Sequence, residues 1–362
     1  MSWVLTIAGF AVLIILHEAG HFAAAKATGM RVERFFLFFP PKLLSIKRGE
    51  TEYGIGALPF GGFVKITGMN PDEDLPADVA PRAYYHQPVW KRIVVISAGP
   101  AMNLLVAFVI LFGLAFGLRD LNNRVGSVEP GYPAATQLQP GDRILAIDGK
   151  SFPNASTEQR VGHFINLVER HKCAGPETDG CRAKTPARVT IERDGQVRTL
   201  SITPEFDPSV DHTRLGFSYG STAAGLSVPG AAGWAASQMW RVTTGTVSVF
   251  SRIFQAQERK KIHGIVGISD VTHQAFEFGA REALGLIALI SLSLAIINLF
   301  PFLPLDGGHI FWSLVEKVRG RPVPFSVMER AGVIGFVLVM VLFAVGLSND
   351  ISRLTGSGFN TR

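Results

Sequence analysis

Four long apolar stretches constrain this chain more than any other feature of its sequence. Each has about 20 residues or more, and the cores of the last three contain no charged side chain. An α-helix needs about 20 apolar residues to cross the hydrocarbon core of a bilayer. We therefore predict a polytopic α-helical membrane protein with four transmembrane helices, in the segments 1–27, 91–118, 284–309 and 331–349.

The composition agrees with a membrane protein. Of the 362 residues, 47% are hydrophobic and only 18% are charged, and the mean hydropathy of +0.26 is too high for an ordinary soluble enzyme. The first apolar stretch has no basic residue before it and no small-residue cleavage site, so we do not expect a removable signal peptide. The basic residues behind the net charge of +6 form no cluster, so we expect no nucleic acid as a partner. The apolar stretches make the lipid bilayer the expected partner.

The basic residues predict the orientation in the membrane. Ten Lys or Arg side chains lie from residue 26 to residue 92, between the apolar cores of the first and second spans, and four lie between the third and fourth spans. Loops rich in Lys and Arg remain in the cytoplasm. The N-terminus and the long segment between the second and third spans are therefore expected to be extracytoplasmic.

The first span carries the motif His17-Glu18-Ala-Gly-His21. In a helix, four residues advance about 400°, so the two imidazoles point the same way and can bind one metal ion. Glu18 can then act as general base on a metal-bound water without ligating the metal itself. A chance match is the alternative, but ionisable groups at membrane depth are costly unless they are paired or functional.

The third span ends in a segment broken by two prolines and two glycines, with a carboxylate at Asp306. Irregular backbone survives at membrane depth only where it is buried or lines a cavity. Two His ligands and one carboxylate, with a water in the fourth position, form a catalytic zinc set. We therefore predict zinc on His17, His21 and Asp306. Alternatively, Asp306 caps the following helix. His309 could be another ligand, although a supporting role is favoured.

Two further polar or irregular features lie in or near the first two spans. Residues 51–67 contain two β-prone runs around Pro59 and Gly61, which predicts a hairpin that either packs against lipid or guides a substrate. Gly99 and Asn103 in the second span are explained by packing against the first span, and support of the metal site is the alternative.

Residues 124–205 show the pattern of a small β-rich domain, with turns at Pro140-Gly141 and Asp194-Gly195. Outside the cytoplasm, Cys173 and Cys181 would form a disulfide. Residues 230–262 run from apolar to basic, which predicts an amphipathic helix on the membrane surface.

These motifs together resemble the site-2 protease family of intramembrane zinc metalloproteases, in particular its bacterial regulator-of-sigma-E type. The resemblance is carried by H-E-A-G-H at 17–21, G-E-T-E-Y-G-I-G-A-L-P-F-G-G-F-V-K at 49–65, G-P-A-M-N at 99–103 and N-L-F-P-F-L-P-L-D-G-G-H at 298–309. The 124–205 segment resembles a PDZ domain through P-A-A and Q-P-G-D-R-I-L-A-I-D-G-K. The best-known members of this type have two tandem PDZ domains, and this chain has length for one.

The resemblance implies the same three zinc ligands, with Glu18 as the catalytic base. It also implies that Asn298 contacts the substrate, and that the 51–67 hairpin re-enters the membrane. There Gly61, Gly62 and Phe63 would hold the substrate as an extended strand, which fits the need to unwind a helical substrate before cleavage.

The implied function is regulated intramembrane proteolysis in the bacterial inner membrane, with the PDZ domain selecting substrates. The substrates would be single-span proteins, either anti-sigma factors already trimmed by a site-1-type protease or remnant signal peptides. One competing hypothesis is an inactive PDZ-bearing adaptor with a structural metal site. A zinc transporter would need polar groups along a path through several spans, and here they are concentrated at one depth.

Overall fold

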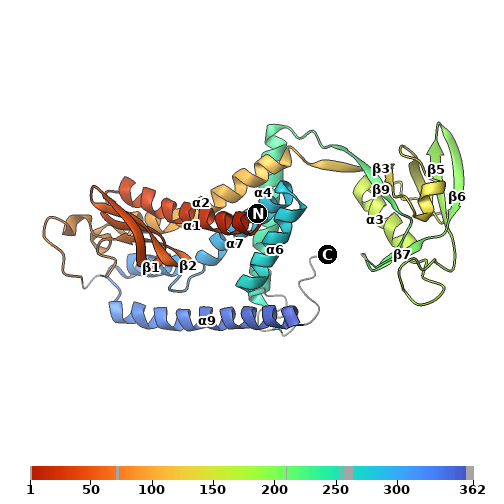
Figure 1. Cartoon of the computed structure of the whole chain (residues 1–362). Coiled ribbons are helices and arrows are strands. Elements are labelled where there is room, and N and C mark those ends of the chain that lie inside the picture. The colour runs from red at the N-terminus through yellow and green to blue at the C-terminus, as the bar shows by residue number, and fades with distance from the viewer. Residues whose placement is uncertain (1, 71–72, 209, 253–254, 256–263, 356–362) are drawn as a thin grey trace. The chain divides into compact units, whose positions relative to one another are not determined.

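The computed structural model describes residues 2–70, 73–208, 210–252, 255 and 264–355, and the chain forms two compact units. Unit 1 combines Met1–Ala115 with Val228–Thr361, and unit 2 is the Phe116–Ser227 segment between them in sequence. Figure 1 shows the elements of both units. The sequence predicts a domain inserted between the second and third spans, and the structure has one there.

Unit 1 contains four helices that are long and apolar enough to cross a membrane, counting the described residues. They are α1 (Ser2–Ala27), α2 (Val89–Ala115), α7 (Ala280–Asn298) and α9 (Phe325–Thr355). The four predicted spans are therefore confirmed as helices, with some ends displaced. The second span stops at Ala115 rather than 118, because Gly117 lies in a turn and a strand follows.

The third span is shorter than predicted. We expected it to reach residue 309, but α7 ends at Asn298 and residues 299–305 form turns. Pro301 and Pro304 have no amide proton to continue the helical hydrogen bonds. A new helix, α8 (Asp306–Arg319), then begins at the predicted metal ligand.

The first loop forms a bent antiparallel sheet from β1 (Val32–Arg48) and β2 (Thr51–Ile66), which lies along α1 (Figure 1). Residues 34–37 of β1 pair with residues 52–55 on one side and with residues 62–65 on the other. Because β1 bends back, its second half also pairs with the first half of β2. The sheet is therefore wider than two straight strands would make it, because bent halves of both strands lie side by side.

This pairing corrects the predicted hairpin. The two halves of the 51–67 segment do not pair with each other in the described sheet, since the aromatic run Phe35–Phe39 of β1 enters between them. That run is strongly β-prone, and its central position buries Phe36 to 4% exposure, whereas Phe39 at the end of the run stays 40% exposed. Residues 62–66 consequently pair on one side only and form an edge of the described sheet.

Two further helices pack against the spans of unit 1. α4 (Val228–Ser251) contacts α2 and α7, and α6 (Ile265–Phe278) contacts α1 and α7. The amphipathic helix predicted for 230–262 is thus a helix as far as Ser251, and its basic end lies outside the described residues. Its location at the membrane surface stays a prediction.

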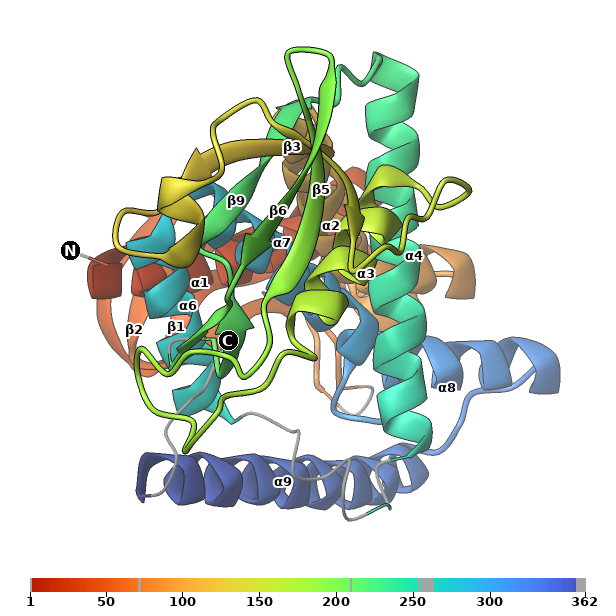
Figure 2. The same ribbon diagram turned by 90° about the vertical axis from the view of Figure 1, so that its right-hand side faces the viewer.

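Unit 2 is a β-rich domain with one long helix. Its five-stranded antiparallel sheet has the order β6-β5-β4-β3-β9, a smaller sheet pairs β7 with β8, and α3 packs beside the strands (Figure 2). The apolar side chains of α3 and the sheet form one core, which includes Ile144, Phe164 and Val189. The bounds are β3 (Arg119–Val128), β4 (Arg143–Ile147), α3 (Thr157–Val168), β5 (Ala187–Arg193), β6 (Gln196–Ile202), β7 (Glu205–Asp207), β8 (His212–Arg214) and β9 (Phe217–Ala223).

The predicted end of this domain at residue 205 is wrong. β9 pairs with β3 along most of its length, so the domain closes only after Ala223. β9 alternates only over Phe217-Ser218-Tyr219 and continues with small or polar residues, so the pattern was too short to predict the strand. The turn at Asp194-Gly195 joins β5 to β6 as predicted, and the predicted disulfide between Cys173 and Cys181 is present.

A buried ion pair fixes the turn that precedes β4. The Asp142 carboxylate is 2% exposed, and Arg193 donates to Oδ1 at 2.7 Å and to Oδ2 at 2.6 Å, while the Gln139 amide donates to Oδ2 at 2.8 Å. The hydrogen bonds from Arg193 hold the pKa of Asp142 below its ordinary value of 3.8. The ionised carboxylate therefore stabilises the folded unit above about pH 4, and this contribution is lost as the pH falls through the lowered pKa.

We expect Asp142→Asn to destabilise unit 2 by about 1.5–3 kcal/mol at pH 7, the range for hydrogen bonds to charged groups. Pulse proteolysis of the full chain in urea, followed on fragments of unit 2, measures this difference. The difference in the free energy of unfolding between wild type and Asp142→Asn should become smaller as the pH is lowered below about 4. A gap of constant size would show that the charge of Asp142 does not stabilise the fold.

Candidate metal centre

The last turns of α1 bring the two histidines together. His17 and His21 are 8% and 7% exposed, and their Nε2 atoms lie 3.3 Å apart. The rings meet edge to face with their centroids 4.9 Å apart. The predicted helical arrangement of the motif is therefore confirmed.

Asp306 completes the cluster from the far end of the sequence. Its Oδ2 lies 3.3 Å from Nε2 of His17 and 3.4 Å from Nε2 of His21. Asp306 is the first residue of α8, and the N-cap position belongs to Leu305, so the alternative in which Asp306 caps the helix is wrong.

The three side chains fit a metal ion. Their ligand atoms lie within 4.8 Å of one another, and Oδ2 of Asp306 is buried and makes no hydrogen bond in the part of the chain that the structure describes. The three atoms therefore converge on one point: the two Nε2 atoms lie within hydrogen-bonding distance of each other, and Oδ2 of Asp306 is left without a hydrogen bond. Two imidazoles and one carboxylate form a donor set typical of catalytic zinc.

Two glycines allow α8 to begin at this position. A side chain at Gly307 would overlap the carbonyl oxygens of Leu299 and Phe300, and one at Gly308 would overlap the backbone of Leu303. The D-G-G sequence thus packs the start of α8 directly onto the turns that follow α7.

Glu18 lies beside the metal-binding group without joining it. Its carboxylate is within hydrogen-bonding reach of the Val64 backbone amide on the edge of the sheet. A Cβ on Gly62 would lie 2.9 Å from Cγ of Glu18 and 3.0 Å from Ile14. The sheet therefore approaches Glu18 so closely that only glycine fits at position 62.

α2 forms the wall behind the two histidines. The Val95 carbonyl lies 2.9 Å from Nδ1 of His21, and the Asn103 side chain lies 3.1 Å from Nδ1 of His17. A side chain at Gly99 would overlap the His21 ring, and one at Gly20 would overlap the Ala98 carbonyl. The predicted packing of Gly99 against the first span is confirmed, but sequence reasoning missed Val95 and the contact of Gly99 with the His21 ring. The paired glycines on two apolar spans were the available signal, since small residues let membrane helices approach closely.

The structure separates the remaining predicted site residues into two groups. Phe63 stacks on Phe36 and Phe39 within the sheet, beside Gly61 and Gly62. Asn298 is the half-buried last residue of α7 and makes no hydrogen bond to the three metal-binding side chains, all of which are described. His309, one turn after Asp306, lies outside the metal-binding group of the described residues.

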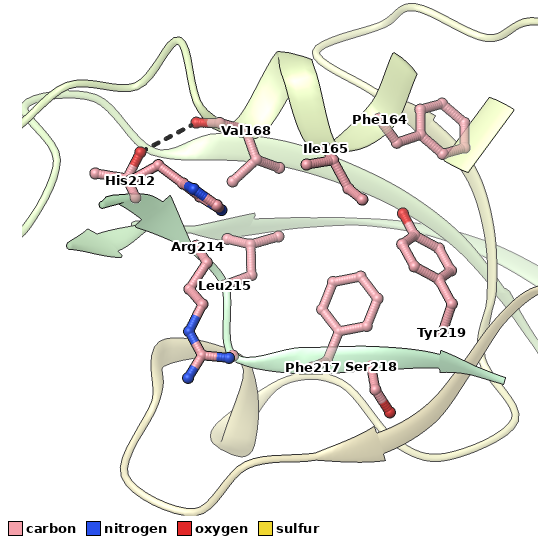
Figure 3. Close-up of a pocket in the computed structure, with 11 residues that line it drawn as sticks. Phe164, Ile165, Val168, His212, Arg214, Leu215, Phe217, Ser218 and Tyr219 are labelled. Atoms are coloured by element: carbon pink, nitrogen blue, oxygen red, sulfur yellow. Dashed lines mark hydrogen bonds between the residues drawn. The ribbon is translucent and has the colours of Figure 1, made fainter. Parts of the chain in front are cut away.

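Unit 2 contains a separate apolar pocket of about 290 Å³ between α3 and β9 (Figure 3). Phe164, Ile165 and Val168 line one side, and Phe217 and Tyr219 line the other. Burial in this pocket raises the pKa of the Tyr219 hydroxyl above its ordinary range.

Arg214 also lines the pocket, and its charge is paired with two carboxylates. Arg214 lies over the Tyr132 ring and donates to both oxygens of Glu129, at 2.7 and 2.6 Å. Arg214 also forms an ion pair of 2.6 Å with Asp207. The side chain is therefore held in place by its partners before any ligand arrives.

Comparisons with known proteins agree with this site. The model of peptidase family M50 matches residues 5–342. A Rhizobium meliloti protein named "Putative zinc metalloprotease" is 32% identical over 371 residues. The match covers 95% of this chain and 94% of the relative. A Clostridium perfringens protein with the same designation is 31% identical over 353 residues, covering 97% of this chain and 98% of the relative.

Among solved structures, the PDZ domain of an SdrC-like protein from Listeria monocytogenes matches 28% of this chain and 90% of its own length, at 19% identity and a TM-score of 0.21. That score is too low to carry a conclusion about unit 2. The family match extends over almost the whole chain, and two full-length relatives exceed 30% identity. The chain therefore belongs to peptidase family M50, the site-2 proteases, and is a multi-pass membrane zinc metalloprotease.

Proposed function

We propose that this protein is an intramembrane endopeptidase that cuts single-span membrane proteins in or near their transmembrane segment. The observation that carries the proposal is the buried convergence of His17, His21 and Asp306, with Glu18 beside them, where α1, a helix long enough to span a membrane, meets the start of α8. We assign zinc to the three converging side chains and the role of general base to Glu18. An inactive adaptor with a structural metal site would not need the carboxylate of Glu18 beside the three ligands.

The chemistry divides between the metal and the chain. When bound, zinc supplies Lewis acidity and makes water a competent nucleophile near neutral pH. Glu18 accepts a proton from the attacking water at its carboxylate and delivers it to the departing amide nitrogen. The carbon–nitrogen bond breaks as the new carbon–oxygen bond forms, so one carboxyl group and one amine result.

The sheet edge beside Glu18 is suited to present the substrate. Residues 62–66 pair on one side only within the described sheet, which leaves backbone groups free for an added strand. We propose that the substrate adds here as an extended strand beside Gly61, Gly62 and Phe63, and that Asn298 contacts it from the end of α7. A substrate helix must unwind before it can bind in this way.

We further propose that the protein works in the bacterial inner membrane with its N-terminus and unit 2 outside the cytoplasm. Unit 2 would act as a PDZ-type filter whose apolar pocket receives the end of a substrate chain. The substrates would be anti-sigma factors already trimmed by a site-1-type protease, or remnant signal peptides. This follows from the resemblance of the sequence motifs and from the charge distribution of the loops.

The proposal is tested with detergent-purified protein and a tagged single-span model substrate. We expect one cleavage in or next to the apolar segment, its loss on treatment with a chelator, and its recovery when about one zinc ion per chain is restored. Mass spectrometry of the two fragments locates the cut. Cleavage only in the soluble flanks of the substrate, or activity that survives complete removal of zinc, would contradict the proposal.

The same assay tests the filter. A substrate that ends in a free apolar residue should be cut faster than one whose chain end is blocked, and Ile165→Glu should remove the difference. Equal rates for both substrates in the wild-type protein would reject the filter while leaving the protease assignment intact.

A further inference from the structure

Both histidines of the metal centre are held from behind by the same helix. In each ring, Nε2 faces Asp306 and Nδ1 faces α2. The partner of His21 is the Val95 carbonyl, and the partner of His17 is the Asn103 carboxamide, two turns further along α2. The two contacts have different chemical consequences.

The hydrogen bond between His21 and the Val95 carbonyl allows only one tautomer of the neutral imidazole. A backbone carbonyl can only accept a hydrogen bond, so the proton of the neutral ring must reside on Nδ1. Nε2 then carries the free lone pair, and it points toward Asp306. His21 is thereby prepared as a metal ligand by a backbone group of α2.

The contact of His17 depends on how the Asn103 carboxamide is turned. Asn103 is fully buried, its Nδ2 lies 3.1 Å from Nδ1 of His17, and its Oδ1 has no partner among residues 2–355 where these are described. In this orientation Asn103 donates to Nδ1, which leaves the ring proton on Nε2, the atom that must bind the metal. A half-turn of the carboxamide presents Oδ1 to Nδ1, and the oxygen without a partner then accepts from Nδ1–H.

The backbone of Asn103 is held independently of its side chain. The Ser291 hydroxyl of α7 donates to the Asn103 carbonyl at 2.9 Å, and Ser291 is itself fully buried. The carboxamide can therefore turn while the helix stays in place. The only change needed for metal binding at His17 is a rotation about one side-chain bond.

We propose that Asn103 is a positioning residue for the metal centre: its side-chain oxygen accepts from Nδ1–H of His17 and so directs the Nε2 lone pair at the ion. The proposal rests on the ligand set assigned under the proposed function. It explains why a carboxamide occurs at full burial in the part of α2 after Arg92, where Ser97 is the one other polar side chain. Groups that orient a ligating histidine typically change metal affinity by about 10–100-fold when they are removed.

Two substitutions separate this role from simple packing. Asn103→Leu keeps the branched shape of the side chain, with larger methyl groups at its end, and removes the acceptor, so we expect zinc affinity to fall about 10–100-fold. Asn103→Asp preserves an acceptor and cannot donate when ionised, so its zinc affinity should be no more than about threefold weaker than wild type. A packing role predicts the opposite order, since a buried charge is worse for packing than leucine.

The measurement is zinc affinity at pH 7.5 on the full chain in detergent, by competition with a chromophoric chelator. Ser291→Ala is the matched control, because it removes a neighbouring hydrogen bond without touching the His17 ring, and it should bind zinc as wild type does. His17→Ala should abolish binding. If it does not, the proposed ligand set is wrong, whatever Asn103 does.

Two results would overturn the role of Asn103. One is an Asn103→Leu protein that elutes as folded protein and binds zinc within threefold of wild type. The other is an Asn103→Asp protein that binds zinc at least tenfold more weakly. If the leucine variant does not fold, the aspartate variant decides alone, since only an acceptor at position 103 is compatible with the proposal.

Discussion

Replacing Glu18 by glutamine is expected to reduce peptide cleavage by about 10²–10⁴-fold, the usual contribution of a general base. Glutamine has nearly the same shape but cannot accept a proton from water. The change should leave the metal in place, because Glu18 lies outside the group formed by His17, His21 and Asp306. Loss of cleavage without loss of zinc distinguishes a base from a ligand.

The experiment compares the cleavage rate and the zinc content of wild type and Glu18→Gln in one preparation. Glu158→Gln, on the first turn of α3 in unit 2, is the matched control for replacing a glutamate. It should cleave as wild type does. Turnover retained in a clean Glu18→Gln protein would reject the mechanism, and loss of zinc would make Glu18 a structural part of the metal centre.

Gly99→Ala should disable the metal centre through a single methyl group. A side chain at this position would overlap the imidazole of His21, including the nitrogen proposed to bind zinc. Moving the ring away would strain the hydrogen bond from Nδ1 to the Val95 carbonyl, which is 2.9 Å long. A displacement of about 1 Å at a reacting centre can cost about 10²-fold, and we expect a loss of that size in both zinc affinity and cleavage.

The same helix provides a matched control for this substitution. Gly113 lies on α2, and a side chain built there has no atom within 4 Å. Gly113→Ala should therefore bind zinc and cleave as wild type does. If Gly99→Ala behaves like Gly113→Ala, then α1 and α2 separate easily enough to admit a methyl group, and the close approach of the two helices is not needed for the site.

The chemistry of the centre could be predicted from sequence because each ligand conflicts with its surroundings. His17 and His21 are polar groups in an apolar helix, and Asp306 is a carboxylate next to a membrane segment. A polar group in such a place is costly unless something binds it. The conflict identifies the residue without any knowledge of the fold.

The supporting wall could not be found in this way. Val95 contributes a backbone carbonyl, which any residue carries, so its side chain gives no signal. The role of Gly99 depends on where a second helix passes. Such features become visible only when both helices are placed.

Strand pairing was the other part that the sequence did not determine. The alternation of apolar and polar residues and the turn residues indicate that 51–67 is extended. They do not show which other strand pairs with it. The insertion of residues 34–37 between the two runs is a long-range choice, governed by which aromatic residues gain most from burial. The pairing of β9 with β3 is also a long-range contact, since the paired residues lie 89 to 104 positions apart in the sequence.

The metal centre draws its ligands from the two ends of unit 1, and this has a consequence for the time at which a newly made molecule becomes active. The ribosome completes α1, with both imidazoles, early in synthesis, whereas Asp306 is added only after the whole of unit 2 has been made. For most of its synthesis a growing chain therefore contains the two proposed histidine ligands and lacks the proposed carboxylate ligand Asp306. The order of the sequence therefore delays completion of the proposed ligand set until the inserted unit and the third span have been made.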